Sequence, residues 1–98
     1  MKTRIIRTAD YRRAWEQLTP QMRRIVDNKI RLLSEDPAHP SLNSHRLRQA
    51  RAADVWACYI SINKRLLYQH KGNTIYLWDV GEHSLVERVH LRSFDRPA

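Results

Sequence analysis

The stretch from Val55 to Val89, VWACYISINKRLLYQHKGNTIYLWDVGEHSLVERV, decides the fold of this chain. It is rich in Val, Ile, Tyr, Trp and Leu, the residue types that fit the pleated, half-buried surface of a sheet. It also contains Lys71-Gly72-Asn73, in which Gly and Asn can take the positive φ that a tight hairpin needs. The pattern predicts three or four consecutive short strands, on which basic and imidazole side chains would be held in fixed positions.

Alternation of apolar residues and the turn signals between them set the expected limits of these strands. We expect strands at residues 55–62, 65–70 and 74–80, with turns at Asn63-Lys64 and Lys71–Asn73 and with Gly81 ending the last of them. Residues 85–91 are predicted to form a final strand or a short helix. The tail from Arg92 to Ala98 contains Phe94 but little else to anchor it.

The first third of the chain predicts one short strand and two helices. A strand is expected at residues 2–8, and Thr8 or Asp10 can cap a helix that runs to about Leu18. Thr19-Pro20 is a favoured helix start, and Asp36-Pro37 ends that second helix. Its apolar residues recur on one stripe: Met22, Ile25, Val26, Ile30 and Leu33. Residues 37–54 read as a loop-like connection.

This order of elements predicts an α+β fold. We expect an antiparallel β-sheet meander with the two N-terminal helices packed on one face, and with the other face partly open as the working surface. A chain of 98 residues is long enough for one such domain, spanning 1–98.

The composition narrows the classes of partner. Eighteen Lys plus Arg against ten Asp plus Glu give a formal net charge of +8, which favours nucleic acid, an anionic membrane or an acidic protein. Cys58 is the only cysteine, so an intrachain disulfide framework is excluded and a reducing cytosol fits best. No segment approaches the roughly 18 apolar residues of a membrane span. We therefore expect a cytoplasmic protein without membrane contact.

Three residues are candidates for chemistry on a polyanion. A guanidinium at Arg65, on a predicted strand, could place forked donors on a phosphate, although a solvated strand arginine explains it as well. His83 follows Gly81-Glu82 at a strand end, where an imidazole can accept or deliver protons near neutral pH, but a lone histidine is more often not catalytic. His45 precedes a basic cluster that either meets anions or only adds solubility: Arg46, Arg48 and Arg51.

Other kinds of site find little support. The five histidines show no pair at metal-binding spacing and the acidic residues are scattered, so we expect no metal and no other cofactor. Trp15, Trp56 and Trp78 are expected in the core rather than as platforms for base stacking.

An ordered set of short motifs resembles the RelE/ParE toxin superfamily of type II toxin–antitoxin modules. The motifs are Leu33-Ser-Glu-Asp-Pro37, His45-Arg-Leu47, Val55-Trp56, Arg65-Leu-Leu-Tyr68, Ile75-Tyr-Leu77 and Gly81-Glu-His83. Within the superfamily the chain looks closest to the RelE, YoeB and YafQ branch of ribosome-dependent mRNA interferases. The resemblance implies a microbial-RNase-like fold, metal-free cleavage of mRNA on the ribosome, and a hetero-oligomeric complex with an acidic antitoxin.

The resemblance also implies roles for individual residues. Arg65 matches the arginine that stabilises charge on the scissile phosphate, and Tyr68 matches the packing aromatic of the same strand. His83 and His45 match histidines of YafQ-like active sites. Apart from the resemblance, the basic residues expected to contact RNA or the ribosome through backbone phosphates are Lys64, Arg46, Arg48, Arg51 and Lys71.

Departures from the pattern leave other functions open. The two lysines of the RelE strand fall at Trp56 and Cys58, and the terminal aromatic falls at Glu87, which favours a histidine-based, YafQ-like site. The missing lysines also fit a ParE-like inhibitor of DNA gyrase without nuclease activity. Composition alone permits a non-catalytic basic module that binds nucleic acid.

Overall fold

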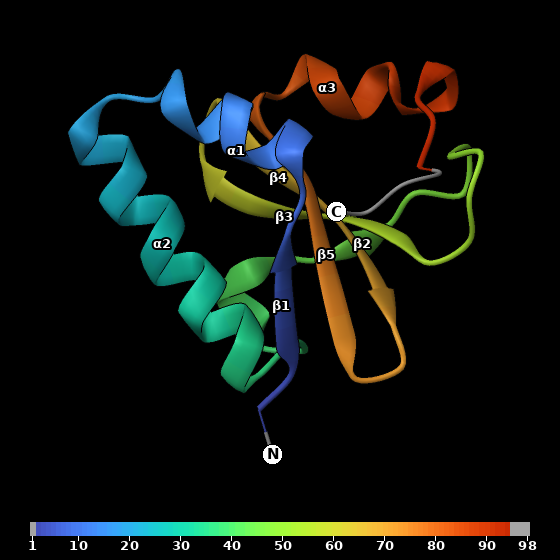
Figure 1. Ribbon diagram of the computed structural model, residues 1–98, viewed down its shortest axis with the longest axis horizontal. Helices are drawn as coiled ribbons and strands as arrows, with labels where there is room; N and C mark the ends of the chain where they lie inside the picture. Colours follow the sequence, from blue (N-terminus) through green and yellow to red (C-terminus); the bar gives the residue numbers. More distant parts are fainter. Residues whose placement is uncertain (1, 95–98) are drawn as a thin grey trace.

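Five strands form one sheet in the order β1-β5-β4-β3-β2 in the computed structural model, which describes residues 2–94 (Figure 1). Their bounds are Arg4–Arg7 (β1), His45–Arg46 (β2), Val55–Ser61 (β3), Lys64–Lys71 (β4) and Thr74–Glu82 (β5). The α+β class is confirmed, but a wholly antiparallel sheet was wrong, because β1 lies parallel to β5. The two helices follow β1, so no hairpin turn forces an antiparallel direction on it.

The two predicted helices are present with the predicted caps. In α1, Ala9–Glu16, the Thr8 side chain accepts from the Tyr11 N–H. In α2, Pro20–Glu35, the Thr19 side chain accepts from the Met22 N–H, and Asp36 ends the helix. Among the helices of residues 2–94, none has both the length and the apolar character needed to cross a bilayer.

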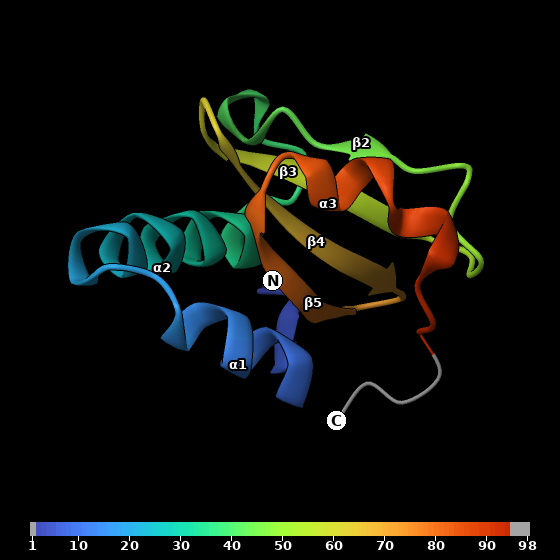
Figure 2. The ribbon, with the colours of Figure 1, turned by 90° about the horizontal axis from the view of Figure 1, so that it is seen from above.

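Both faces of the sheet carry a hydrophobic core, and Figure 2 shows helices on either side. Alternate residues of β3, β4 and β5 pack against α1 and α2, together with the α2 stripe Val26, Ile30 and Leu33. The opposite face is covered by Leu47 and the segment after β5, which forms α3 (Ser84–Glu87) and η2 (Val89–Leu91). The expectation of a partly open face was therefore wrong for the middle of the strands.

Two details of the strand limits differ from the sequence expectation. The turn after β3 lies at Ile62-Asn63, which leaves the Ile62 side chain 80% exposed instead of in the apolar alternation. Gly81 does not end β5, which continues to Glu82. Residues 85–91 take the helical alternative of the two that the pattern allowed.

The C-terminal segment is anchored more firmly than its composition suggested. Arg92 donates to the Asp79 carboxylate at 2.9 Å, to Asp10 at 3.2 Å and to the Trp78 carbonyl at 3.0 Å. Phe94 is buried with its ring edge-on to Trp78, the centroids 5.3 Å apart. Arg92 thus ties η2 to β5 and α1, and the rest of the predicted tail, 95–98, lies outside the described residues.

We expect Arg92→Leu to lower the free energy of unfolding by about 2 kcal/mol at pH 7, because it leaves a largely buried carboxylate unpaired. Burial raises the pKa of Asp79, against the opposing effect of Arg92. A raised folded-state pKa means that Asp79 contributes most stability when protonated and loses that contribution as pH rises. The loss in Arg92→Leu should therefore shrink at about pH 4.5 in urea denaturation.

Arg88→Leu is the matched control, because Arg88 is exposed and makes no ion pair within residues 2–94. The account of this anchor would be contradicted if the free energy of unfolding fell equally in the two variants. It would also be contradicted if the decrease in Arg92→Leu did not change with pH.

Candidate functional site

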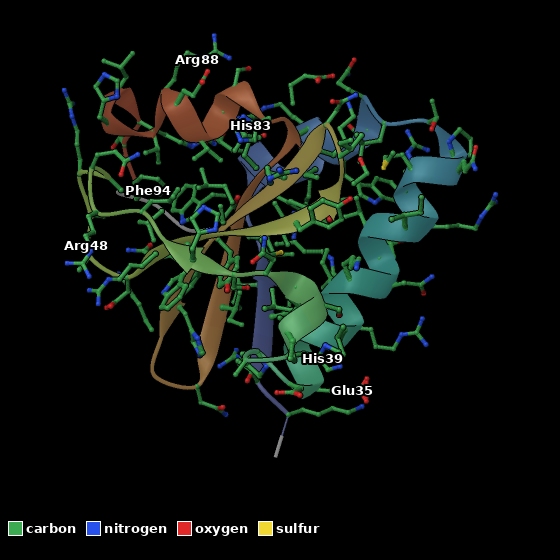
Figure 3. All side chains as sticks on the ribbon, turned by 180° about the vertical axis from the view of Figure 1, so that it is seen from behind. Glu35, His39, Arg48, His83, Arg88 and Phe94 are labelled. Carbon is green, nitrogen blue, oxygen red and sulfur yellow. The ribbon has the colours of Figure 1, made fainter. Side chains whose placement is uncertain are left out.

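The turn between β3 and β4 brings two of the predicted site residues together. The backbone N–H of His83 donates to the Asn63 carbonyl at 3.0 Å, so the start of α3 lies against this turn. Arg65 is the second residue of β4 and lies opposite Gly81 of β5. Arg65 and His83 therefore belong to one end of the sheet, and Figure 3 shows His83 at that end.

The Arg65 side chain is held in place by backbone and ring contacts. Its Nη1 donates to the Ser61 carbonyl at 2.7 Å and to the Lys64 carbonyl at 2.9 Å. Its guanidinium carbon lies 5.1 Å from the centroid of the Tyr59 ring, within the range of a cation–π contact. No carboxylate of residues 2–94 pairs with it, so the charge is free to meet an anion from outside.

His83 is exposed and takes the capping position of α3 without a side-chain hydrogen bond to the helix. Its backbone is fixed by the bond to Asn63, while its ring nitrogens bond to no group within residues 2–94. A positioned imidazole with both nitrogens free can exchange protons with a ligand near neutral pH.

His45 lies on the same face of the sheet but farther along it. It pairs with Ala57 in the β2–β3 register, as Arg65 pairs with Tyr59, and alternate residues share a face. Along the strand direction the two positions differ by two residues, about 7 Å, and β3 lies between β2 and β4, which adds about 10 Å across the sheet. The structure therefore places His45 apart from Arg65 and His83, with its Nδ1 3.4 Å from the Asn43 carbonyl.

The predicted basic contacts are scattered over three places. Lys64 pairs with Glu82 at 2.7 Å, and Arg46 pairs with Asp54 at 3.2 Å. Arg48 and Arg51 are exposed on the loop 47–54 without an ion pair in the described part of the chain, and Figure 3 shows Arg48 away from His83. Lys71 lies seven residues from Lys64 on β4, about 23 Å along the strand.

Of the two positions where lysines were missing from the family pattern, one is buried and the other half-buried. Cys58 is buried, and burial raises the pKa of its thiol to about 12. Trp56 is half-buried and packs beside the helix-side core. Tyr68 is buried as expected, donates to the Ser44 hydroxyl at 3.1 Å, and has a pKa raised to about 12 by burial. These residues cannot replace the cationic pair.

Sequence reasoning missed a hollow of about 610 Å³ at the other end of the sheet. Its lining comes from the loop 37–44, which includes η1 (Pro40–Leu42), and from β3 and β4: Pro37, Ala38, His39, Pro40, Asn43, Ser44, Trp56, Tyr68 and His70. The available signal was that His70, Tyr68 and Trp56 share the helix-side face of neighbouring strands. The loop 37–44 that closes the hollow has no periodic pattern that would have revealed it.

Within residues 2–94, no three His, Cys, Asp or Glu side chains gather in a way that could hold a metal ion. The turn brings together an imidazole, a guanidinium and the Lys64–Glu82 ion pair.

The fold is similar to that of solved bacterial toxins. YafQ in the DinJ–YafQ complex from E. coli matches with a TM-score of 0.71 and 11% identity, over 86% of this chain and 96% of that chain. The YoeB dimer from Staphylococcus aureus matches with a TM-score of 0.69 and 14% identity, over 85% of this chain and 99% of that chain. The RelBE2 complex from Mycobacterium tuberculosis matches with a TM-score of 0.62 and 21% identity, over 85% of this chain and 100% of that chain.

No protein-family model matches the sequence, and no curated protein does. The fold that the motifs implied is confirmed: the chain is similar in fold to solved YafQ, YoeB and RelBE2 structures.

Glu82→Gln tests the electrostatics at the turn. Removing this carboxylate leaves Lys64 unpaired beside Arg65 and His83, so binding to heparin should persist to higher salt. The free energy of unfolding should change by less than about 1 kcal/mol, because the Glu82 side chain is 67% exposed. Glu87→Gln, an exposed residue of α3 without an ion pair in residues 2–94, changes the net charge equally. Identical heparin elution of the two variants would show that Glu82 does not control this site.

Proposed function

We propose that this protein is the toxin of a type II toxin–antitoxin module and cleaves mRNA on the ribosome as a metal-independent endoribonuclease. The observation that carries the proposal is the Arg65 guanidinium, which pairs with no carboxylate of residues 2–94 and lies at the same strand end as His83, in a fold similar to those of YafQ, YoeB and RelBE2 structures. The proposal places the protein in the cytoplasm, where translation takes place.

RNA cleavage by the ribose 2′-OH has requirements that these groups meet. A base must take the hydroxyl proton, positive charge must stabilise the dianionic phosphorane, and an acid must protonate the departing 5′-oxygen. Arg65 supplies the charge, with one nitrogen anchored to two carbonyls and the remainder of the guanidinium available to the phosphate. His83 supplies one of the proton transfers at the same end of the sheet.

In this proposal His45 shares the proton transfers with His83, in an order that the geometry leaves open. Because His45 lies two register positions from Arg65 along the sheet and on the far side of β3, it reaches the same phosphate with the help of an intervening water or of movement of the short strand β2. β2 has only two residues, paired on one side with β3, so it is the least constrained strand of the sheet. We therefore expect a smaller contribution from His45 than from His83.

The basic residues around these groups provide affinity for backbone phosphates. Arg48 and Arg51 are exposed and unpaired within residues 2–94, whereas Lys64 and Arg46 must exchange a carboxylate for a phosphate. Lys71 would contact RNA or the ribosome at the far end of β4. Such contacts weaken steeply as salt concentration rises.

We propose an acidic antitoxin as the protein partner, in a toxin–antitoxin hetero-oligomer. The YafQ and RelBE2 structures that this fold resembles are complexes of this kind. The net charge of +8 favours an acidic partner. Leu91, an exposed apolar residue of η2, is one of the side chains that a partner could cover.

One observation favours the alternative of a ParE-like inhibitor of DNA gyrase without nuclease activity. The half-buried Trp56 and the buried Cys58 occupy the positions of the RelE lysines, so the cationic pair of that branch is absent. Primer extension on translated mRNA beside a gyrase supercoiling assay separates the two functions. Codon-biased cleavage supports the first and supercoiling inhibition the second. Salt-sensitive RNA binding with neither activity would instead indicate a basic nucleic-acid-binding module.

His83→Ala should reduce mRNA cleavage at least about a hundredfold, and Arg65→Lys about a hundredfold, because each removes a group that acts in the transition state. His45→Ala should reduce cleavage about tenfold, in keeping with one charged hydrogen bond. Single-turnover cleavage by primer extension measures the three losses, with ribosome binding measured in parallel and expected to be retained.

His90→Ala is the control, because His90 is exposed on η2 away from the β3–β4 turn. Activity of His83→Ala within a few-fold of the parent would remove His83 from the mechanism.

A further inference from the structure

The hollow lies at the end of the sheet away from the β3–β4 turn, and its lining suits a planar ring. Trp56 and Tyr68 are direct partners in the β3–β4 register, and both side chains line the hollow. Pro37 and Pro40 line it from the loop side, so aromatic and pyrrolidine rings face a space of about 610 Å³. That volume is in the range of pockets that take small ligands.

The polar side chains of the hollow are imidazole, amide and hydroxyl groups. Among residues 2–94, no Lys, Arg, Asp or Glu lines it. His39 uses Nδ1 to accept from the Ser41 N–H at 3.1 Å, which leaves Nε2 available. The side chains of His70 and Asn43 make no hydrogen bond within residues 2–94 and line the same space. A ring with several donors and acceptors but no charge matches these groups, and a nucleobase is such a ring.

The position of the hollow connects it to the edge of the proposed nuclease face. Asn43 and Ser44 line the hollow, and the next residue, His45, turns to the opposite side of the sheet. Lys71 follows His70, is exposed, and makes no ion pair within residues 2–94. Figure 3 shows His39 and His83 at separate ends of the molecule, so the two sites are distinct. A single strand that passes His45 could wrap round the β2 edge and place a base in the hollow.

We propose that the hollow lined by Trp56, His70 and Asn43 binds one unpaired nucleobase of single-stranded RNA. This inference rests on the proposed function for the identity of the polymer. The base lies against the Trp56 indole, and the imidazoles of His39 and His70 and the Asn43 amide read its edge. The site selects a base some nucleotides away from the cleaved bond.

Fluorescence anisotropy with a labelled, uncleavable 2′-O-methyl RNA tests the proposal on the full chain. We expect Trp56→Leu to weaken binding between about 5-fold and 100-fold, the range for loss of one base–aromatic contact. His70→Ala and Asn43→Gly should each weaken it by several-fold, and Asn43→Gly keeps the positive φ of 45° at that position. His90→Ala is the matched control for His70→Ala, and thermal unfolding checks that each variant is folded.

Replacing single nucleotides of the RNA by abasic residues supplies the second half of the test. One abasic position should weaken binding to the parent protein as much as Trp56→Leu does, and should have little further effect in that variant. If every abasic RNA binds like the intact strand, or if Trp56→Leu and His70→Ala bind like the parent, the hollow does not hold a base. Variants that keep RNA affinity but lose the acidic protein partner would overturn the proposal in favour of a protein-docking surface.

The readout does not depend on cleavage. If binding depends on the base but no cleavage is seen, the nucleobase site is supported and the proposed nuclease activity is rejected. If cleavage is seen but binding does not depend on any base, the nuclease activity is supported and the nucleobase site is rejected.

Discussion

Burial of β3, β4 and β5 on both faces is the constraint on which the rest of the structure depends. Leu66 and Tyr68 pack toward α1 and α2, while Leu67 packs toward Val89 and Phe94 on the other side. Two cores on one sheet leave little room for charged groups in the middle of these strands, and Asp79 of β5 is held there by an ion pair with Arg92. Arg92 holds the second core closed through its contacts with Asp79, Asp10 and the Trp78 carbonyl.

Functional groups are therefore confined to the ends of the strands and to the edge formed by β2. One end presents Arg65 and His83 at the Ile62-Asn63 turn, with the guanidinium fixed by backbone carbonyls. The other end presents the hollow beside Trp56 and His70. His45 lies on the edge that links them. This division separates an end with a guanidinium, suited to phosphate, from a hollow lined by aromatic, imidazole and amide side chains, suited to a base.

Much of the fold could be predicted because local signals agree with it. Thr8 and Thr19 cap the helices as their positions suggested, and Gly72 takes the positive φ that the hairpin requires. Tertiary effects account for the errors. The direction of β1 is not set by a turn, and Gly81 stays in β5 because neighbouring β4 continues to pair with it. Ile62 was placed in a strand by its apolar character, although it lies in the turn.

The candidate site could be predicted from the sequence only in part. Motif order singled out Arg65, His83 and His45, but spacing along the chain could not show that the first two share a turn and the third lies farther along the strand. The hollow depends on a loop that packs against β3 and β4, a contact that no periodicity reveals.

Amide chemical shifts recorded while an uncleavable 2′-O-methyl RNA is added test most directly whether nucleic acid meets the strand ends. The account predicts shifts at the β3–β4 turn, at residues 81–84 and along the β2 edge from Asn43 to Arg46. Shifts confined to the outer surfaces of α1 and α2, with these segments unchanged, would contradict it.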